Sequence, residues 1–348
     1  MTGTARALRT ALLTTVTTLA LAPAALAQNP PPTPTPTPPP AAPTPTPTPV
    51  PPAPAPAAAK LRIGVAPPYR DRTRRLALRG DRVQVTGTLT PYVAGQSVVV
   101  RVRAGKKTLV TRKVAVQPAT AGQGAYSVWV RLWRPGSLSI QASHARTAQQ
   151  RTARSSALRI VVARAALNYG SSGSLTRIFQ RKLRLMRFEA RPTGRYDDAT
   201  ARAVMAWRKL NHRSRIYSAD AGVVRGVLAS RGGWKVRHPT AGHHVEADIS
   251  LQALALIDGD RVQHVYPTSS GKPSTPTVLG TYRFYSKTPG TNSHGMVDSN
   301  YFVGGYAIHG YFDVPAYNAS HGCLRVPIPD AATIYGWIRL GDRIFVEP

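Results

Sequence analysis

The hydrophobic period of this 348-residue chain changes twice, and no other feature constrains the fold as strongly. From about residue 61 to 162, apolar and polar residues alternate, as in half-buried strands. From 169 to 231, apolar residues recur every three or four positions, as in amphipathic helices, and after Gly232-Gly233 the alternation returns. A chain of this length can bury two or three separate cores. We therefore predict a multidomain, mainly β protein with a helical segment in its middle.

The first 59 residues predict no folded domain. Residues 1–27 carry two arginines, then an apolar run, and end on Ala25-Leu26-Ala27, which predicts a cleaved secretory signal peptide. An uncleaved anchor is the alternative, although the run is shorter than the roughly 20 apolar residues of a spanning helix. Residues 28–59 are nearly all Pro, Thr and Ala, which predicts an extended, disordered linker. We expect export to an extracytoplasmic space (cell wall or periplasm-like space), with no stable membrane span after cleavage.

Residues 60–164 predict an immunoglobulin-like β-sandwich. Alternating valines at 83 and 85, and again at 98, 100 and 102, indicate six or seven short strands in about 100 residues, with Gly and Pro between them. Trp129 and Trp133 leave two interpretations open. They are a platform on which sugar rings stack, or they belong to a packed second face or a domain contact.

Residues 165–232 resemble the small three-helix peptidoglycan-binding domain. The resemblance is carried by Tyr-Gly-Ser-Ser-Gly at 169–173, Phe-Gln-Arg-Lys-Leu at 179–183 and Thr-Gly-Arg-Tyr-Asp-Asp-Ala-Thr at 193–200, where the aspartates can cap the second helix. Members of that family have a Phe-Gln pair in the last helix, whereas this chain has Trp207-Arg208. This difference concerns the carbohydrate-facing surface more than the fold. A helical spacer is the alternative.

The formal net charge of +31 comes almost entirely from arginines spread through every region after the linker. Such a surface attracts polyanions, and inside a cell the expected polyanion would be nucleic acid. Because we predict export, we expect no nucleic acid partner. Anionic wall polymers and membrane head groups remain open as partners, and so do solvated arginine-rich faces that bind nothing.

The chain contains a single cysteine, Cys323, so no intramolecular disulfide can form and its thiol stays free. A thiol becomes an effective nucleophile when a histidine lies within hydrogen-bond reach. His321 precedes Cys323 by two positions and would share its face in an extended segment, but Gly322 between them points to a turn. His309 would have to come from a neighbouring strand. The spacing leaves both histidines open.

Residues 240–348 resemble the catalytic domain of YkuD-type L,D-transpeptidases. The signature of that family is a histidine, a gap and then Ser/Thr-His-Gly-Cys, as in His309 and the sequence from Ser320 to Cys323. Stretches 269–273, 275–282 and 301–310 also resemble family motifs in the same order. The resemblance implies a mainly β catalytic domain with the cysteine at the mouth of a cleft.

The resemblance also implies roles for individual residues. Cys323 is expected to be the nucleophile and His309 the group that takes its proton. Backbone amides near Gly322 and Cys323 are expected to hold the oxyanion. Many members have an asparagine where this chain has Arg325, which bears on acceptor preference. The other site residues implied are those that shape the nucleophile turn and those that line the donor site: Ser320, His321 and Gly322 for the turn, and Tyr301, Phe302 and Gly305 for the donor site.

The function implied is that of a cysteine acyltransferase that cross-links peptidoglycan stem peptides through a thioester, with stem peptides and glycan as partners, no cofactor, and carbapenems as inhibitors. An L,D-carboxypeptidase that hydrolyses the same thioester is an alternative, and a non-catalytic wall-binding protein is another. The C-terminal histidines, including His243-His244 and His294, match no common zinc spacing, so we predict no metal.

Overall fold

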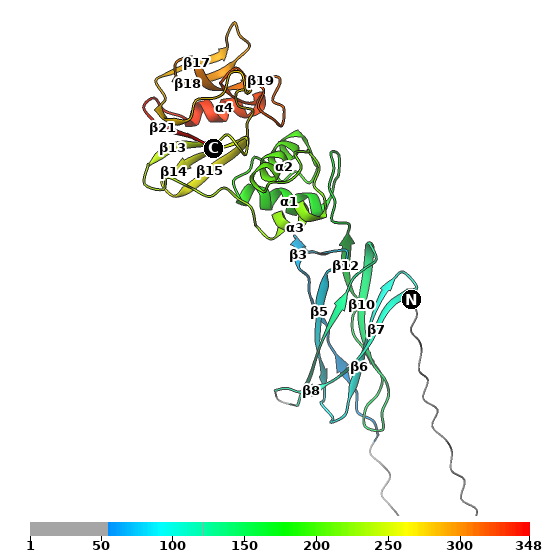
Figure 1. Cartoon of the computed structure of the whole chain (residues 1–348). Coiled ribbons are helices and arrows are strands. Elements are labelled where there is room, and N and C mark those ends of the chain that lie inside the picture. The colour runs from blue at the N-terminus through cyan, green and yellow to red at the C-terminus, as the bar shows by residue number, and fades with distance from the viewer. Residues whose placement is uncertain (1–54, 121) are drawn as a thin grey trace, which may run out of the picture. The chain divides into compact units, whose positions relative to one another are not determined.

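The computed structural model describes residues 55–120 and 122–348 (Figure 1). The predicted signal peptide lies outside these residues, as does the predicted linker except for its last five residues. The described chain is multidomain and mainly β, with β-sheets at its N-terminal side, three helices between residues 174 and 228, and a β-rich C-terminal part. In this part of the chain, no helix is long and apolar enough to cross a membrane.

The N-terminal β part consists of two sheets. One sheet has the order β1-β5-β9-β8, with β2 paired to β5, and the other has the order β3-β4-β12-β10-β6-β7, with β11 paired to β10. The predicted alternation is present, because Val98, Val100 and Val102 of β6 are buried and the residues between them are not. The strands are β1 (Lys60–Leu61), β2 (Gly64–Ala66), β3 (Tyr69–Asp71), β4 (Arg74–Leu78), β5 (Arg82–Thr90), β6 (Ser97–Ala104), β7 (Lys107–Ala115), β8 (Gln117–Pro118), β9 (Gly124–Arg131), β10 (Gly136–His144), β11 (Ala153–Arg154) and β12 (Leu158–Ala163).

Valines and leucines from both sheets form one core, so the sheets pack face to face. Trp129 and Trp133 are not part of that core. Their side chains are 51% and 58% exposed, and the guanidinium carbons of Arg82 and Arg131 lie 5.5 and 5.4 Å from the respective ring centroids. Within the described residues, the two rings therefore do not form a packed second face.

The middle of the chain forms α1 (Ser174–Leu185), α2 (Asp198–Leu210) and α3 (Ala221–Leu228). The predicted aspartate cap is present, since the Asp197 side chain accepts a hydrogen bond from the backbone N–H of Thr200 at 2.9 Å. The buried Gln180 amide of α1 donates to the carbonyl of Arg195 at 2.8 Å, and its oxygen accepts from the N–H of Gly194 at 2.8 Å. This side chain fixes the loop between α1 and α2.

The helices share one hydrophobic core with strands from the rest of the chain, including Ala255, Ile257 and Val265 of the C-terminal part. An ion pair adds to this junction: Nε and Nη2 of Arg202 on α2 each lie 2.9 Å from a carboxylate oxygen of Asp330. Because two N–H groups of one guanidinium meet two oxygens of one carboxylate, the pair fixes orientation as well as distance.

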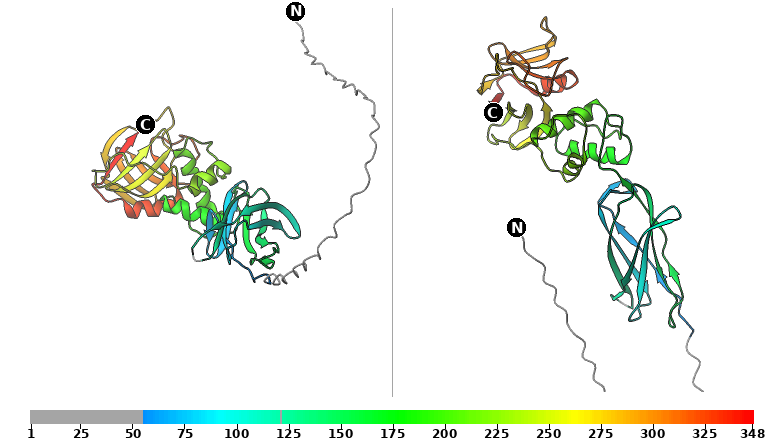
Figure 2. Two further views of the ribbon diagram at one scale, coloured as in Figure 1. Left: turned by 90° about the horizontal axis from the view of Figure 1, so that it is seen from below. Right: turned by 45° about the vertical axis from the view of Figure 1, so that its right-hand side comes forward.

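The C-terminal part has two sheets, with the orders β15-β14-β13-β21-β16 and β17-β18-β19-β20. The pair Asp258-Gly259, which is typical of tight hairpins, joins the antiparallel strands β14 and β15, and Gly259 has a φ of +61°. Helix α4 packs on β18 and β19 (Figure 2). The elements are β13 (His243–Asp248), β14 (Ala253–Asp258), β15 (Arg261–Pro267), β16 (Gly280–Arg283), β17 (Ser286–Thr291), β18 (Val297–Val303), β19 (Tyr306–Tyr311), β20 (Leu324–Pro327), α4 (Ile328–Trp337) and β21 (Arg343–Glu347).

Candidate functional site

Cys323 lies in a turn that leads directly into β20, which runs parallel to β19 with His309 opposite Arg325. This pairing brings together residues that are distant in the sequence. They surround a cavity of about 360 Å³. Its lining contains five of the predicted site residues and three others: Ser320, His321, Cys323, His309 and Arg325 were predicted, whereas His294, Met296 and Tyr311 were not.

The turn before Cys323 requires a glycine. Gly322 has a φ of +120°, and a Cβ added to it would lie 1.9 Å from Cε1 of Tyr306. The Oγ of Ser320 accepts a hydrogen bond from the Gly322 N–H at 3.1 Å and donates to the Cys323 carbonyl at 2.6 Å. One buried hydroxyl therefore closes the turn at both ends.

A second loop holds this turn from the other side. Ser269 and Arg325 exchange two backbone hydrogen bonds of 3.0 Å, and the hydroxyl of Thr277 donates to the Gly322 carbonyl at 2.8 Å. The N–H of Ser320 donates to the carbonyl of Ser270 at 2.9 Å. The stretches 269–273 and 275–282, which resemble family motifs in the sequence, thus hold the turn that carries the thiol.

Lys209 of α2 supports that loop in turn, and the sequence reasoning missed it. Its side chain is 2% exposed, and its Nζ donates to the carbonyls of Gln252 at 3.0 Å and Thr268 at 2.7 Å. Burial, with a smaller contribution from the charge of Arg215, lowers the pKa of Lys209 to about 7. A signal was available, because Lys209 follows the apolar Met205 by four positions and therefore lies on the buried face of α2.

His309 is held in a neutral form with one free nitrogen. The ring is 3% exposed, and its Nδ1 donates to the carbonyl of Gly310 at 2.9 Å, so Nε2 carries the lone pair. Burial lowers the pKa of His309 to about 4. The hydrogen bond to Gly310 opposes that shift, and the positive charge of Arg325 adds to it.

His321 has a different environment. It is exposed, and the Nζ of Lys272 lies 3.1 Å from its Nε2. A charged ammonium can only donate, so the Nε2 of His321 accepts this bond and its lone pair is occupied.

The thiol of Cys323 is partly buried, and its Sγ donates to the carbonyl of Gly305 at 3.8 Å. Burial raises the pKa of Cys323, while a backbone hydrogen bond from Ala307 and the charge of Arg325 oppose that shift with smaller effects. No hydrogen bond within the described residues joins the thiol to a histidine. The arrangement is therefore a neutral thiol near a neutral imidazole, not a preformed ion pair.

The ring of Tyr311 contacts both the charged Arg325 and the neutral His309. The guanidinium carbon of Arg325 lies 4.2 Å from its ring centroid, and the ring meets His309 edge-on with centroids 5.6 Å apart. Asp313 lies 3.8 Å from the Arg325 guanidinium but is more than half exposed. Tyr311 follows His309 by two positions on one strand, so the period-two alternation could have predicted it.

The predicted donor-site residues lie in different places. The carbonyl of Gly305 meets the thiol, whereas Tyr301 and Phe302 do not line the cavity. Phe302 is buried in the core against Tyr282 and Phe284, with ring centroids 5.8 and 6.2 Å away. The donor-site role of these residues stays a prediction. Within the described residues, no three His, Cys, Asp or Glu side chains are placed to hold a metal ion together.

Comparison with known proteins agrees with this geometry. Residues 242–346 match the family model described as the L,D-transpeptidase catalytic domain. Residues 242–346 form a YkuD-type L,D-transpeptidase catalytic domain. A search of curated proteins finds no match.

Among the solved structures similar to this chain are L,D-transpeptidases from several organisms. The protein from Xylanimonas cellulosilytica is 27% identical, with 52% of this chain and 96% of that chain covered and a TM-score of 0.49. The protein from Mycobacterium smegmatis is 14% identical, with 83% and 100% covered and a TM-score of 0.28. The protein from Stackebrandtia nassauensis is 14% identical, with 52% and 94% covered and a TM-score of 0.33. The L,D-transpeptidase assignment rests on the family model.

The protonation state of the thiol can be tested by alkylation. We expect the rate at which iodoacetamide modifies Cys323 to rise with pH and to reach half its maximum above about pH 8.5, the ordinary thiol value, because burial disfavours the thiolate. Arg325→Gln should move the midpoint higher still, since it removes a charge that favours the thiolate. The urea-unfolded protein provides the reference curve. A midpoint below pH 7 in the folded protein would show that an ion pair exists.

Lys209 gives a pH-dependent effect on stability. In the unfolded chain it titrates near pH 10.4, and in the folded chain near 7, so between these values the unfolded state binds the extra proton and folding is disfavoured. Raising the pH from 7 to 9.5 should therefore stabilise the wild type relative to Lys209→Met by about 3 kcal/mol, as measured by urea unfolding. Replacing the exposed Arg184 of α1 by Met should leave the wild-type pH dependence in place. Parallel curves for wild type and Lys209→Met would refute the assignment.

Proposed function

We propose that this protein is an L,D-transpeptidase that cross-links peptidoglycan stem peptides through a thioester on Cys323. The main support is that the only thiol of the chain lies on a glycine turn in a cavity that also holds a buried, neutral histidine, within an L,D-transpeptidase catalytic domain. The family acts on the cell wall, which agrees with an extracytoplasmic location.

We assign the base to His309. Its Nε2 lone pair is free and the ring is neutral at physiological pH, whereas the Nε2 of His321 is occupied by Lys272. A neutral imidazole with a lowered pKa is a weak base. The proton is therefore transferred while the carbon–sulfur bond forms, and general base catalysis of this kind contributes about 10²–10⁴-fold.

The reaction has two steps. The Sγ of Cys323 attacks the carbonyl carbon of the third stem residue, and its proton passes to Nε2 of His309. The tetrahedral intermediate collapses, the carbon–nitrogen bond breaks, and His309 returns the proton to the departing D-Ala amine. The amine of a second stem peptide then attacks the thioester, gives its proton to His309, and releases Cys323 as a thiol.

The negative charge of the tetrahedral intermediate requires donors that are not already engaged. The N–H of Gly322 already donates to Ser320, so we assign the main backbone donor to the N–H of Cys323. Arg325 supplies a positive charge in the same cavity, and we assign it to the carboxylate of the donor peptide.

The preceding parts of the chain are assigned to wall attachment. We propose that residues 60–164 form an immunoglobulin-like sandwich and 165–232 a peptidoglycan-binding-like domain, with catalysis confined to 240–348. The signal peptide proposed at 1–27 fits export. The extended linker proposed at 28–59 would let the folded domains reach further into the wall. Hydrolysis of the thioester, which would make the protein an L,D-carboxypeptidase, uses the same residues and is distinguished by whether the product is a cross-linked dimer or a tripeptide.

Variants of the three residues separate the roles. With a stem tetrapeptide as donor, intact mass spectrometry should show a thioester on the wild type and none on Cys323→Ala. His309→Ala should slow acylation by about 100-fold or more, because the attacking thiol loses its proton acceptor. His321→Ala should stay within about tenfold of the wild type. If His321→Ala lost acylation while His309→Ala kept it, the assigned base would be wrong.

Carbapenems offer a second test of the nucleophile. A cysteine that attacks an amide carbonyl should also open a strained β-lactam ring, so a single covalent adduct is expected on the wild type. The Cys323→Ser variant is the matched control, because it keeps the size of the side chain but loses the soft thiol nucleophile. Persistence of the adduct on Cys323→Ala would place the reaction elsewhere on the chain.

A further inference from the structure

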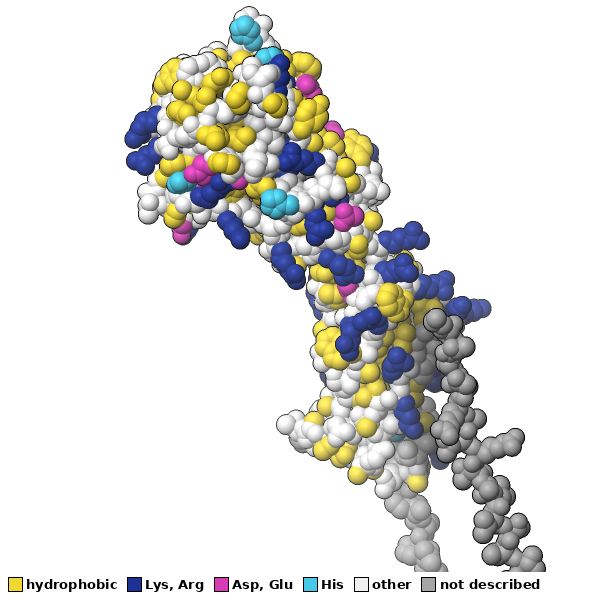
Figure 3. All heavy atoms as spheres, viewed as in Figure 1, with side chains coloured by type: hydrophobic (Ala, Val, Ile, Leu, Met, Phe, Trp, Pro, Cys, Tyr) yellow, Lys and Arg dark blue, Asp and Glu magenta, His cyan; other side chains and the backbone are white. Residues whose placement is uncertain are grey.

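The N-terminal β part has an unusual charge distribution. Residues 82–163 contain 13 Lys and Arg and no Asp or Glu. The two carboxylates among the described residues before this stretch are already engaged, because Asp71 pairs with Arg177 and Arg181, and Asp81 pairs with Arg225. On the face shown in Figure 3, Lys and Arg side chains recur along the surface formed by these strands. The positive charge of this part is therefore not neutralised by its own side chains.

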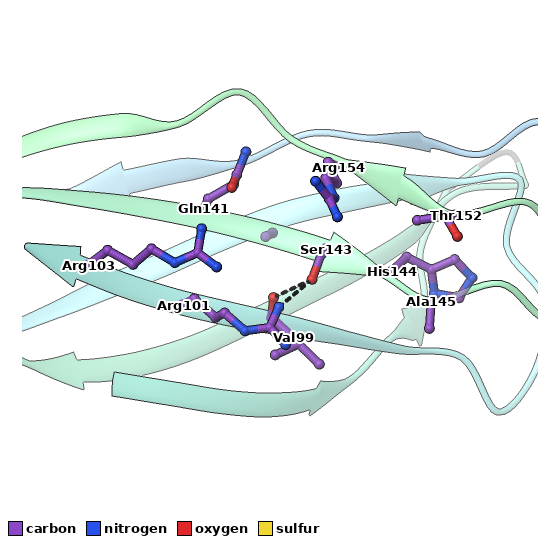
Figure 4. A pocket seen from close by; sticks show the side chains of 10 residues that line it. Val99, Arg101, Arg103, Gln141, Ser143, His144, Ala145, Thr152 and Arg154 are labelled. Atoms are coloured by element: carbon purple, nitrogen blue, oxygen red, sulfur yellow. Dashed lines mark hydrogen bonds between the residues drawn. The ribbon is translucent and has the colours of Figure 1, made fainter. Parts of the chain in front are cut away.

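Part of this charge is concentrated in one hollow. A cavity of about 230 Å³ lies on the outer face of the seven-stranded sheet, over β6, β10 and β11 (Figure 4). Arg101 and Arg103 alternate outward from β6 and lie about 6.7 Å apart along the strand. Arg154 enters from β11, which pairs with β10 at Ser143. Three guanidinium groups thus line one cavity.

The polar neighbours of these arginines hold them in place without neutralising them. Nη1 of Arg101 donates to the hydroxyl of Ser143 at 3.0 Å, and Nε of Arg103 donates to the hydroxyl of Thr108 at 3.3 Å. Gln141 is fixed by a bond from its Nε2 to the carbonyl of Ser155 at 2.9 Å. Each guanidinium has five N–H groups, so most of the donors remain available.

Several arginines elsewhere in the described residues contact a carboxylate. Arg202, Arg208 and Arg237 each have a carboxylate partner. No salt bridge within the described residues involves any of the three arginines of the cavity. Because no carboxylate offsets these three positive charges, the cavity favours an anionic ligand.

We propose that this arginine cavity binds the phosphate groups of a linear anionic polymer in the cell wall. Phosphate suits the site because a planar guanidinium can donate two parallel N–H bonds to two phosphate oxygens. The ligand then matches both the charge and the geometry of the arginines. A polymer suits it because the cations continue beyond the cavity on the same sheet. Arg159 on β12 pairs with Ser139, which also pairs with Arg103, and Lys113 on β7 pairs with Val99. The β part would thus hold the enzyme on the wall independently of the catalytic cavity.

The test compares two variants of equal net charge in the full chain. Arg101→Gln, Arg103→Gln and Arg154→Gln together remove the cavity cations, whereas Arg134→Gln, Lys106→Gln and Arg146→Gln remove three exposed cations elsewhere on the β part. Binding to soluble poly(glycerol phosphate) is measured by titration at 150 mM salt. Melting curves check that both variants fold, and thioester formation on a stem tetrapeptide checks that the catalytic domain is intact.

We expect the cavity variant to lose affinity by about tenfold or more and the control variant by less than about threefold, because charge-assisted bonds are lost only in the first. Vesicles of phosphatidylglycerol should compete weakly, and inorganic phosphate should compete only at high concentration. Equal losses in both variants would show a diffuse charge effect and overturn the proposal. Tighter binding to the vesicles than to the polymer would also overturn it, in favour of a lipid surface. The Cys323→Ala variant, which should form no thioester, should bind the polymer as tightly as the wild type. Failure of the proposed acyl transfer would therefore not decide whether the arginine cavity binds the polymer.

Discussion

The parallel pairing of β19 with β20 is the contact on which the candidate site depends. It sets His309 opposite Arg325 and brings the turn that carries Cys323 to the strand that carries the histidine. A parallel neighbour cannot be reached by a tight hairpin, so the chain must leave β19, cross over, and return through the glycine turn. The loop around Ser269 and Thr277 then fixes where that return ends. The position of the thiol is thus determined by backbone hydrogen bonds together with the hydroxyls of Ser320 and Thr277.

The cavity combines opposing electrostatic effects. Burial keeps both His309 and Cys323 neutral, while the charge of Arg325 favours the thiolate and disfavours the imidazolium. Tyr311 lies against Arg325 and His309 and limits the water around both. The thiol and the imidazole are therefore both uncharged before substrate arrives. In the mechanism that we propose, the attack and the proton transfer are therefore coupled to each other.

The sequence predicted the parts of the fold and site that depend on local pattern. The strand alternation, the aspartate cap at Asp197 and the hairpin at Asp258-Gly259 all follow from short-range rules. Lys209 was missed because its partners are carbonyls far away in the sequence, and no local pattern encodes them. The placement of Phe302 was also beyond the pattern, since the register of β18 shifts between Tyr301 and Val303, and alternation does not hold across a bulge.

The raised pKa of Cys323 also affects how long the thiol survives. Oxidants attack the thiolate far faster than the thiol, and oxidation beyond the sulfenic acid is generally irreversible. A chain with a single cysteine cannot protect it as an internal disulfide. Keeping the sulfur protonated and partly buried therefore slows its oxidation. The same desolvation that makes the thiol less reactive thus lengthens the time for which it stays unoxidised.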